Sequence, residues 1–220
     1  MRIVAGSARG RRIEAPSGQA TRPTSDRTRE ALFSAIESQR GVLAGARVLD
    51  LYAGSGAVGL EAASRGAAHV VLVESEAAAA RVARRNVEHL ALRQVHLTTT
   101  TVERWVEQTD PDPEPDQTFD VVFADPPYSL APDRLREVLT GLLDRAVLAP
   151  QALVVVERSS RDAAWTWPQG LSALRDRRYG EATLWYGRAA AGRTGTEPGA
   201  PGDSATGQSA AGHSPAGEDQ

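Results

Sequence analysis

The fold is decided by the stretch Arg47-Val-Leu-Asp50-Leu-Tyr52-Ala-Gly54-Ser-Gly56-Ala-Val-Gly59, an apolar run that enters a glycine-rich turn and then a helix pattern. This order is typical of the first unit of a parallel sheet. Further strand patterns follow at 69–74, 95–99, 119–124 and 152–157, separated by helix patterns over about 76–90, 102–107 and 132–144. The alternation predicts an α/β fold with a doubly wound, mostly parallel sheet and helices on both faces.

Both ends of the chain depart from this alternation. Patterns at 171–178 and 182–186 predict a hairpin that closes the sheet antiparallel. Ahead of the sheet, 2–5 and 11–14 predict a small N-terminal β-hairpin, and 25–38 predicts an amphipathic helix. We therefore divide the chain into an extension at 1–40, a sheet domain at 41–188, and a tail at 189–220. The tail lacks large apolar residues, which predicts disorder.

The composition excludes several kinds of site. The chain has no cysteine, and its four histidines are not at metal-ligand spacing with one another or with a carboxylate cluster. We therefore predict no metal site. No apolar run approaches the ~20 residues of a membrane span, and the N-terminus has no apolar signal segment. These features predict a cytoplasmic protein without membrane contact.

Charge is unevenly distributed along the chain. The net charge is −3, but the tail alone accounts for it, so residues 1–188 are neutral. Residues 1–40 carry eight arginines against four acidic residues, and the chain has no lysine. A local excess of arginine favours contact with phosphate groups, as in nucleic-acid binding. Charge alone leaves a solvated basic face as the alternative.

The turn after the first strand indicates the ligand. Gly54 and Gly56 allow a tight turn and close approach of the backbone, and Glu74, twenty residues after Gly54, can accept both ribose hydroxyls of an adenosine. The same glycines also fit a dinucleotide site. Asp50 favours S-adenosylmethionine, because a carboxylate there would repel a pyrophosphate and suits a cationic amino group and sulfonium. A glycine-rich turn that binds nothing is the structural alternative.

A second motif, Asp125-Pro126-Pro127-Tyr128, follows the strand at 119–124. Ligands of open α/β sheets bind at the carboxyl ends of the strands, so both motifs should line one crevice. Asp125 and the Pro126 carbonyl can accept the two N–H bonds of an exocyclic base amine and free its lone pair. Tyr128 can stack on the base, and the anionic neighbour stabilises the developing positive charge. The alternative is a turn that prolines stiffen.

These motifs resemble the Rossmann-type methyltransferases that modify exocyclic amines. The segments Arg2-Ile-Val-Ala-Gly6, Arg9-Gly-Arg-Arg12 and Arg22-Pro-Thr-Ser-Asp-Arg-Thr-Arg-Glu-Ala-Leu-Phe33 resemble the bacterial 16S ribosomal RNA guanine-N2 methyltransferases of the RsmD type, and the resemblance covers residues 1 to about 187. It implies a Rossmann-like methyltransferase sheet and methyl transfer from S-adenosylmethionine to the N2 of a specific guanine in 16S rRNA. We expect a monomer whose substrate lies within an assembling small-subunit particle.

The resemblance also implies that the extension at 1–40 folds as a lid over cofactor and RNA. The expected cofactor contacts are Thr24, Asp50, Tyr52, Ala53, Gly54, Ser55, Gly56, Glu74, Ser75, Thr101 and Asp125. The expected RNA contacts are Arg9, Arg11, Arg12, Arg22, Arg27 and Arg29. The expected catalytic group is Asp125, Pro126, Pro127 and Tyr128. One departure is Thr100-Thr101, where the family often has Asn or Asp near the adenine; a Thr hydroxyl or a backbone N–H can still make that contact.

The predicted helix at 25–38 offers an independent reason for an anion. Arg22, Arg27 and Arg29 lie on or near its first turn, where cations oppose the helix dipole. Their placement is explained if RNA phosphate docks there. A partly buried Asp26–Arg pair is the structural alternative.

Three other functions compete with this interpretation. A DNA adenine-N6 methyltransferase shares the Asp-Pro-Pro-Tyr chemistry but usually carries an added recognition domain, for which no span between the predicted elements is long enough. An NAD-dependent oxidoreductase would need a substrate domain and a hydride-transfer dyad that the sequence does not offer. A non-catalytic RNA-binding module would not need both motifs intact.

Overall fold

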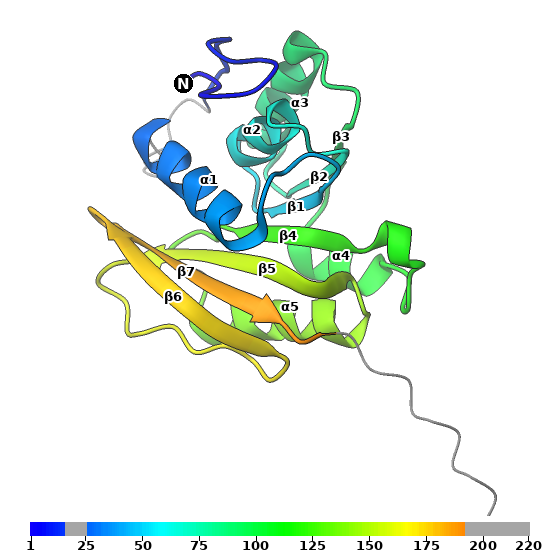
Figure 1. Ribbon diagram of the computed structural model, residues 1–220, viewed down its shortest axis with the longest axis vertical. Helices are drawn as coiled ribbons and strands as arrows, with labels where there is room; N and C mark the ends of the chain where they lie inside the picture. The colour runs from blue at the N-terminus through cyan, green and yellow to red at the C-terminus, as the bar shows by residue number, and fades with distance from the viewer. Residues whose placement is uncertain (16–25, 192–220) are drawn as a thin grey trace, which may run out of the picture.

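The computed structural model describes residues 1–15 and 26–191 and arranges them as one layered α/β unit (Figure 1). The elements, in chain order, are α1 (Asp26–Arg40), β1 (Arg47–Leu51), α2 (Ala57–Ser64), β2 (His69–Glu74), α3 (Ala77–Leu90), β3 (Val95–Thr99), α4 (Val102–Gln108), the 3-10 turn η1 (Pro115–Gln117), β4 (Phe119–Ala124), α5 (Pro132–Asp144), β5 (Leu148–Ser159), β6 (Leu171–Tyr179) and β7 (Ala182–Ala189). Thr24 and Arg22, named above as site residues, lie outside the described residues, as does the tail from residue 192.

The sheet confirms the predicted architecture. Its strands run in the order β3-β2-β1-β4-β5-β7-β6. The first five pair in parallel, and β7 pairs antiparallel with both β5 and β6. The sheet grows from β1 toward one edge through β2 and β3, and toward the other edge through β4 and β5. The order of the strands therefore reverses at β1, and a crevice opens there at the carboxyl ends of the strands.

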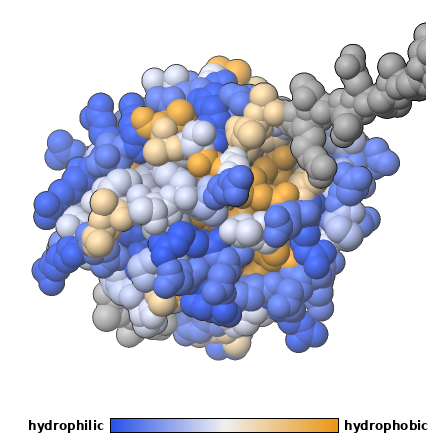
Figure 2. All heavy atoms as spheres, turned by 90° about the horizontal axis from the view of Figure 1, so that it is seen from below, coloured by the Kyte–Doolittle hydropathy of each residue, from blue (hydrophilic) through white to orange (hydrophobic). Residues whose placement is uncertain are grey.

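Two apolar layers hold helices on the two faces of the sheet. On one face, residues such as Val48 and Val70 pack with α1, α2 and α3. On the other, residues such as Leu49 and Leu51 pack with α4 and α5. Successive residues of a strand point to opposite faces of the sheet, and helices cover both faces. Both sets of positions are therefore apolar, which explains the nearly continuous apolar runs in the sequence. Figure 2, which views the molecule from below, shows mostly hydrophilic side chains on the outer surface and a smaller apolar area between them.

The N-terminal extension is less regular than predicted. Its two segments hydrogen bond to each other, for example from the Ile3 N–H to the Arg11 carbonyl at 3.0 Å, but they form only an isolated bridge between Arg2 and Arg12 instead of two strands. The reason is that Ile3, Ala8 and Ile13 are buried in the core beneath α1, α2 and α3 and take the chain away from a flat ladder.

A buried carboxylate ties this extension to the sheet domain. Glu61 on α2 is fully buried and accepts the backbone N–H groups of Val4 and Ala5 at 2.7 and 2.9 Å. It also pairs with Arg29 of α1 at 3.5 Å and with Arg65 at 3.0 Å. The extension, α1 and α2 therefore share one charged contact as well as one apolar core.

Two boundaries differ from the sequence patterns. β5 begins at Leu148, four residues before the predicted strand, and η1 forms within the proline-rich segment that was expected to be a loop. No helix among the described residues is long and apolar enough to cross a membrane.

Candidate active site

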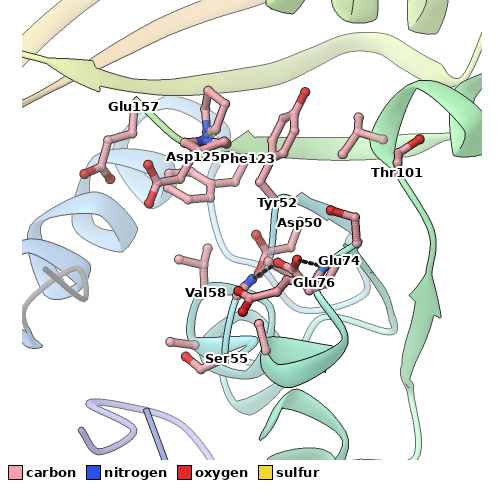
Figure 3. Close-up of a pocket in the computed structure, with 18 of the residues that line it drawn as sticks. Asp50, Tyr52, Ser55, Val58, Glu74, Glu76, Thr101, Phe123, Asp125 and Glu157 are labelled. Carbon is pink, nitrogen blue, oxygen red and sulfur yellow. Dashed lines mark hydrogen bonds between the residues drawn. The ribbon is translucent and has the colours of Figure 1, made fainter. Parts of the chain in front are cut away.

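A pocket of about 520 Å³ opens at the carboxyl ends of β1, β2 and β4 (Figure 3). Its volume falls within the ~300–1,000 Å³ of small-molecule sites. Both sequence motifs contribute to its wall. The lining residues are Met1, Asp50, Tyr52, Ala53, Gly54, Ser55, Ala57, Val58, Glu74, Ser75, Glu76, Ala79, Thr101, Val102, Glu103, Phe123, Asp125, Pro126, Pro127, Tyr128 and Glu157.

The turn after β1 presents its backbone to the pocket at Gly54. Gly54 has φ +56°, a left-handed conformation that favours glycine, and a Cβ there would meet open space. Its N–H donates to Glu74 at 2.7 Å, and the N–H of Glu76 donates to the other oxygen of Glu74 at 2.6 Å. Glu74 therefore fixes the turn while its carboxylate borders the pocket (Figure 3).

Gly56 has a different role from the one predicted. It is not among the residues that line the pocket, so its expected contact with the cofactor is not supported. Gly56 precedes α2 with φ +78°, and a Cβ there would lie 2.9 Å from a Leu72 methyl carbon. A Cβ at Gly59 would lie 2.2 Å from the same side chain. These two glycines let α2 pack closely on β2, and only Gly54 faces the ligand space.

Asp50 lies at the base of the pocket. It is 2% exposed, and its carboxylate accepts the Gly59 N–H at 2.8 Å, which holds the start of α2 against β1. Burial raises the pKa of Asp50 to about 7; the Gly59 hydrogen bond lowers it in part, and the charges of Asp125 and Glu74 raise it further. A positively charged group in the pocket would favour the ionised form.

The Asp125-Pro126-Pro127-Tyr128 segment forms the opposite wall. Pro126 is buried, while Tyr128 is 58% exposed at the rim, where a base can reach its ring. Burial also raises the pKa of Asp125 to about 7, and the charge of Arg158 lowers it in part. Arg158 fixes this wall from behind: it donates to the Leu130 carbonyl at 3.1 Å.

Strand alternation places four carboxylates on one face of the sheet. Each of these carboxylates comes two residues after an apolar residue that belongs to the core under α1, α2 and α3. Residues two positions apart on a strand point to the same face of the sheet. The pairs are Val48 and Asp50, Leu72 and Glu74, Phe123 and Asp125, and Val155 and Glu157. Glu76 and Glu103 add two further carboxylates to the wall.

This electrostatic character fits S-adenosylmethionine better than a dinucleotide. No arginine or histidine side chain is among the described residues that line the pocket. A pyrophosphate would meet six carboxylates there, whereas a sulfonium and an amino group would be attracted to them. The fit therefore rests on the six lining carboxylates, with that of Asp50 buried at the base, and on the open space at Gly54.

The far end of the pocket is bordered by the first turn of α4. The Thr101 hydroxyl caps this helix by accepting the Arg104 N–H at 3.2 Å, and Val102 and Glu103 line the pocket beside it. Thr101 therefore lines the pocket, and its contact with an adenine stays a prediction. Tyr52 borders the same cavity with φ +59°. Sequence reasoning missed Val58, Glu76, Glu103, Phe123 and Glu157, of which Glu157 ends the strand pattern predicted at 152–157 and lies two residues before the end of β5.

The arginines of the extension fall into two groups. Arg9, Arg12 and Arg27 are exposed and can meet a charged partner. Arg11 is also exposed, but its guanidinium donates to the carbonyls of Leu90 and His89 at the end of α3. That contact satisfies helix carbonyls and agrees with the helix dipole.

The predicted RNA contact of Arg29 is wrong. Arg29 is fully buried, donates to the Arg2 carbonyl, and pairs with Asp26 at 2.9 Å and with Glu61 at 3.5 Å. The alternative of a buried Asp26–Arg pair is therefore correct for this residue. The spacing of Arg29, Leu32, Phe33 and Ile36 along α1 places all four on its buried face.

Comparison with known proteins identifies relatives over almost the whole described chain. The family model described as "Conserved hypothetical protein 95" matches residues 1–188. The ribosomal RNA small subunit methyltransferase D of Escherichia coli is 33% identical over 195 residues, which is 88% of this chain and 93% of that protein. The protein of the same name from Haemophilus influenzae is 30% identical and covers 82% of this chain and 89% of its own.

Solved structures agree with this relationship. A methyltransferase structure from Escherichia coli superposes with a TM-score of 0.73 at 31% identity and covers 87% of this chain and 99% of its own. An RNA methyltransferase from Salinibacter ruber, solved with S-adenosyl-L-homocysteine, shares the fold at a TM-score of 0.56 and 16% identity, and covers 77% of this chain and 94% of its own. The resemblance found in the sequence motifs is thereby confirmed, and the chain belongs to the RsmD family of ribosomal RNA small subunit methyltransferases.

Proposed function

We propose that this protein transfers a methyl group from S-adenosylmethionine to the exocyclic N2 of a guanine in 16S rRNA. One observation carries the proposal: the Asp125–Tyr128 wall and the Gly54 turn with Glu74 border a single pocket. A base amine held by the first and a cofactor held by the second would meet inside it. Family membership supplies the small-subunit rRNA.

The chain provides groups for each part of the cofactor. Glu74 can accept the ribose hydroxyls with lone pairs that its two backbone partners leave unused. The start of α4 at Thr101 borders the adenine end, and Asp50 gives the amino group and sulfonium a negative counterpart. When bound, S-adenosylmethionine supplies an electrophilic methyl carbon attached to a positively charged sulfur.

The opposite wall prepares the amine. Asp125 and the Pro126 carbonyl accept its two N–H bonds, and Tyr128 stacks on the base at the pocket rim. As the lone pair forms the nitrogen–carbon bond and the carbon–sulfur bond breaks, the amine becomes acidic and must release one proton. Burial holds the pKa of Asp125 near 7, so its carboxylate can take that proton at neutral pH.

The RNA-facing surface follows from the exposed arginines. Arg9, Arg12 and Arg27 remain as phosphate contacts of the extension, whereas Arg29 serves the fold. We further propose a monomer that needs no metal ion and acts in the cytoplasm on an assembling small subunit, where the target guanine is still accessible.

A DNA adenine-N6 methyltransferase is the less favoured alternative. The chain covers 93% of a relative that is named for ribosomal RNA, and the connections between the described elements are too short to form a separate DNA-recognition domain. An NAD-dependent oxidoreductase is disfavoured by the carboxylates that surround the pocket.

The test is in vitro methylation of ribosomes from a strain that lacks the family member. Purified protein and labelled S-adenosylmethionine are added to its naked 16S rRNA and to its small subunits, and the nucleosides are separated by mass spectrometry. Labelled N2-methylguanosine, absent with the Asp125→Ala protein, is expected. N6-methyladenosine, or no labelled nucleoside from either substrate, would contradict the proposal.

A further inference from the structure

Glu157 lies beside Asp125 on the neighbouring strand β5, two residues before the end of that strand. β4 and β5 run in parallel with Ala124 opposite Val156, so Asp125 and Glu157 occupy the next position of the same register. Residues opposite one another in a sheet direct their side chains to the same face. Phe123 and Val155, two residues earlier, both pack under α1, α2 and α3, and the two carboxylates follow them to that face.

The Glu157 side chain belongs to the pocket. Glu157 is 9% exposed and lines the same cavity as Asp125 and Tyr128. Figure 3 shows both carboxylates directed into the cavity on the same side. Burial raises the pKa of the Tyr128 hydroxyl, and the charges of Asp125 and Glu157, followed by those of Glu181 and Asp162, raise it further. A base stacked on Tyr128 would therefore meet two carboxylates along one edge.

The hydrogen-bonding edge of guanine matches two adjacent carboxylates. Guanine carries the N2 amine next to a protonated N1, so its edge presents neighbouring N–H donors. Adenine carries its N6 amine next to an unprotonated N1, whose lone pair would face the second carboxylate. An ionised carboxylate can only accept hydrogen bonds, so with adenine the N1 lone pair and the carboxylate oxygen would face each other as two acceptors without a proton between them. A buried mismatch of this kind is strongly rejected.

We propose that Glu157 determines the choice of base by accepting the N1–H of the target guanine while Asp125 holds its N2 amine. The inference rests on the proposed function, since it assigns a reader to the base that is methylated there. It makes Glu157 a specificity-determining residue. The Asp125-Pro126-Pro127-Tyr128 wall activates an amine, and Glu157 selects which base presents that amine.

The discriminating probe is 2-aminopurine, which keeps the amine at C2 and lacks the N1 proton. The substrate is 16S rRNA ligated from transcripts and a synthetic fragment, so that the modified nucleotide is guanosine or 2-aminopurine riboside. It is presented both as naked RNA and as reconstituted small subunits. Single-turnover methylation rates are measured for the wild type, Glu157→Gln and Glu181→Gln. Glu181 is an exposed residue of the β6–β7 turn that pairs with Arg161, and its variant controls for loss of a carboxylate near the site.

The wild type should methylate the guanosine substrate at least ~10²-fold faster than the 2-aminopurine substrate. A glutamine at position 157 can turn its amide NH₂ toward the N1 lone pair of 2-aminopurine, so Glu157→Gln should lower this ratio to below about tenfold, chiefly by speeding the 2-aminopurine reaction. Glu181→Gln should keep the wild-type ratio. Melting curves and S-adenosylhomocysteine binding verify that each variant is folded.

The outcomes separate the inference from the proposed function. A Glu157→Gln protein that slows both substrates equally would overturn the inference and leave the proposed function standing, because a purely structural role affects both bases alike. A wild type that does not distinguish the two substrates would also overturn it. A wild type that methylates neither substrate would overturn the proposed function, and the inference with it.

Discussion

Replacing Asp125 with asparagine should make the protein more stable at alkaline pH while it impairs catalysis. The structure gives the reason: burial raises the pKa of the Asp125 carboxyl from 3.8 to about 7. This folded-state pKa lies above that of the unfolded chain. Below about pH 4 the Asp125 carboxyl is protonated in both states, so it does not destabilise the fold there. Its destabilising effect grows as the pH rises and levels off above about 7.

The size of the effect follows from the shift. Each pKa unit corresponds to ~1.4 kcal/mol, so three units set an upper bound of about 4 kcal/mol. Asp125 keeps some contact with solvent, and screening by that solvent reduces the value to about 2 kcal/mol. Asn has the same shape and no charge. The free energy of unfolding of Asp125→Asn, relative to the wild type, should therefore rise by about 1–2 kcal/mol between pH 5 and pH 8.

Urea unfolding of the ligand-free proteins at the two pH values measures this difference. Single-turnover methylation at pH 8 measures chemistry on the same samples, and it should fall by about 10²–10³ for Asp125→Asn and further for Asp125→Ala. Asp116→Asn, which removes a charge from the exposed turn η1, is the control and should change neither quantity. An Asp125→Asn protein with the same relative stability at both pH values, or with the wild-type methylation rate, would refute the reasoning.

Three further perturbations test separate parts of the structure. Glu74→Ala should weaken S-adenosylhomocysteine binding at least ~tenfold by calorimetry, because the Gly54 turn loses its acceptor; unchanged affinity would remove Glu74 from the cofactor site. Replacing Arg9 and Arg12 with alanine should lower the slope of log affinity for rRNA against log salt by about one per lost phosphate contact; an unchanged slope would leave only a solvated face. Gly59→Ala should reduce the free energy of unfolding by about 1–3 kcal/mol, because its methyl group would overlap β2; denaturation at wild-type urea concentration would contradict the close packing.

The sheet was predictable because its strands are short apolar runs between clear turn signals. The five parallel strands lie where the patterns predicted them, except that β5 begins four residues before its prediction, at Leu148. Its first residues were not predicted as strand because Pro150 interrupts the apolar pattern there. The N-terminal hairpin was overestimated for a tertiary reason. Ile3 and Ile13 fit an alternating strand pattern, but they are drawn into the core under the helices, which a local pattern does not contain.

Within the site, residue types were predictable and directions were harder to predict. Gly54 and Gly56 look equivalent in the sequence, yet only the first faces the pocket, because the second meets Leu72 of β2. Arg29 was assigned to RNA with the other arginines, although its spacing with the apolar residues of α1 already indicated a buried face. Its partner Glu61 could not be foreseen, since their contact forms only when α1 packs beside α2.

The same spacing argument would have found Glu157. Each of Asp50, Glu74 and Asp125 follows a core residue two positions earlier on its strand, and Glu157 repeats the pattern on β5. A fold selected for stability alone would not bury the carboxylates of Asp50 and Asp125, because burial raises the pKa of each to about 7. Their negative charge becomes favourable only when positively charged and proton-donating groups enter the pocket. Asp50 and Asp125, whose ionisation weakens the fold near neutral pH, are therefore the residues to which we assign attraction of the sulfonium and activation of the amine.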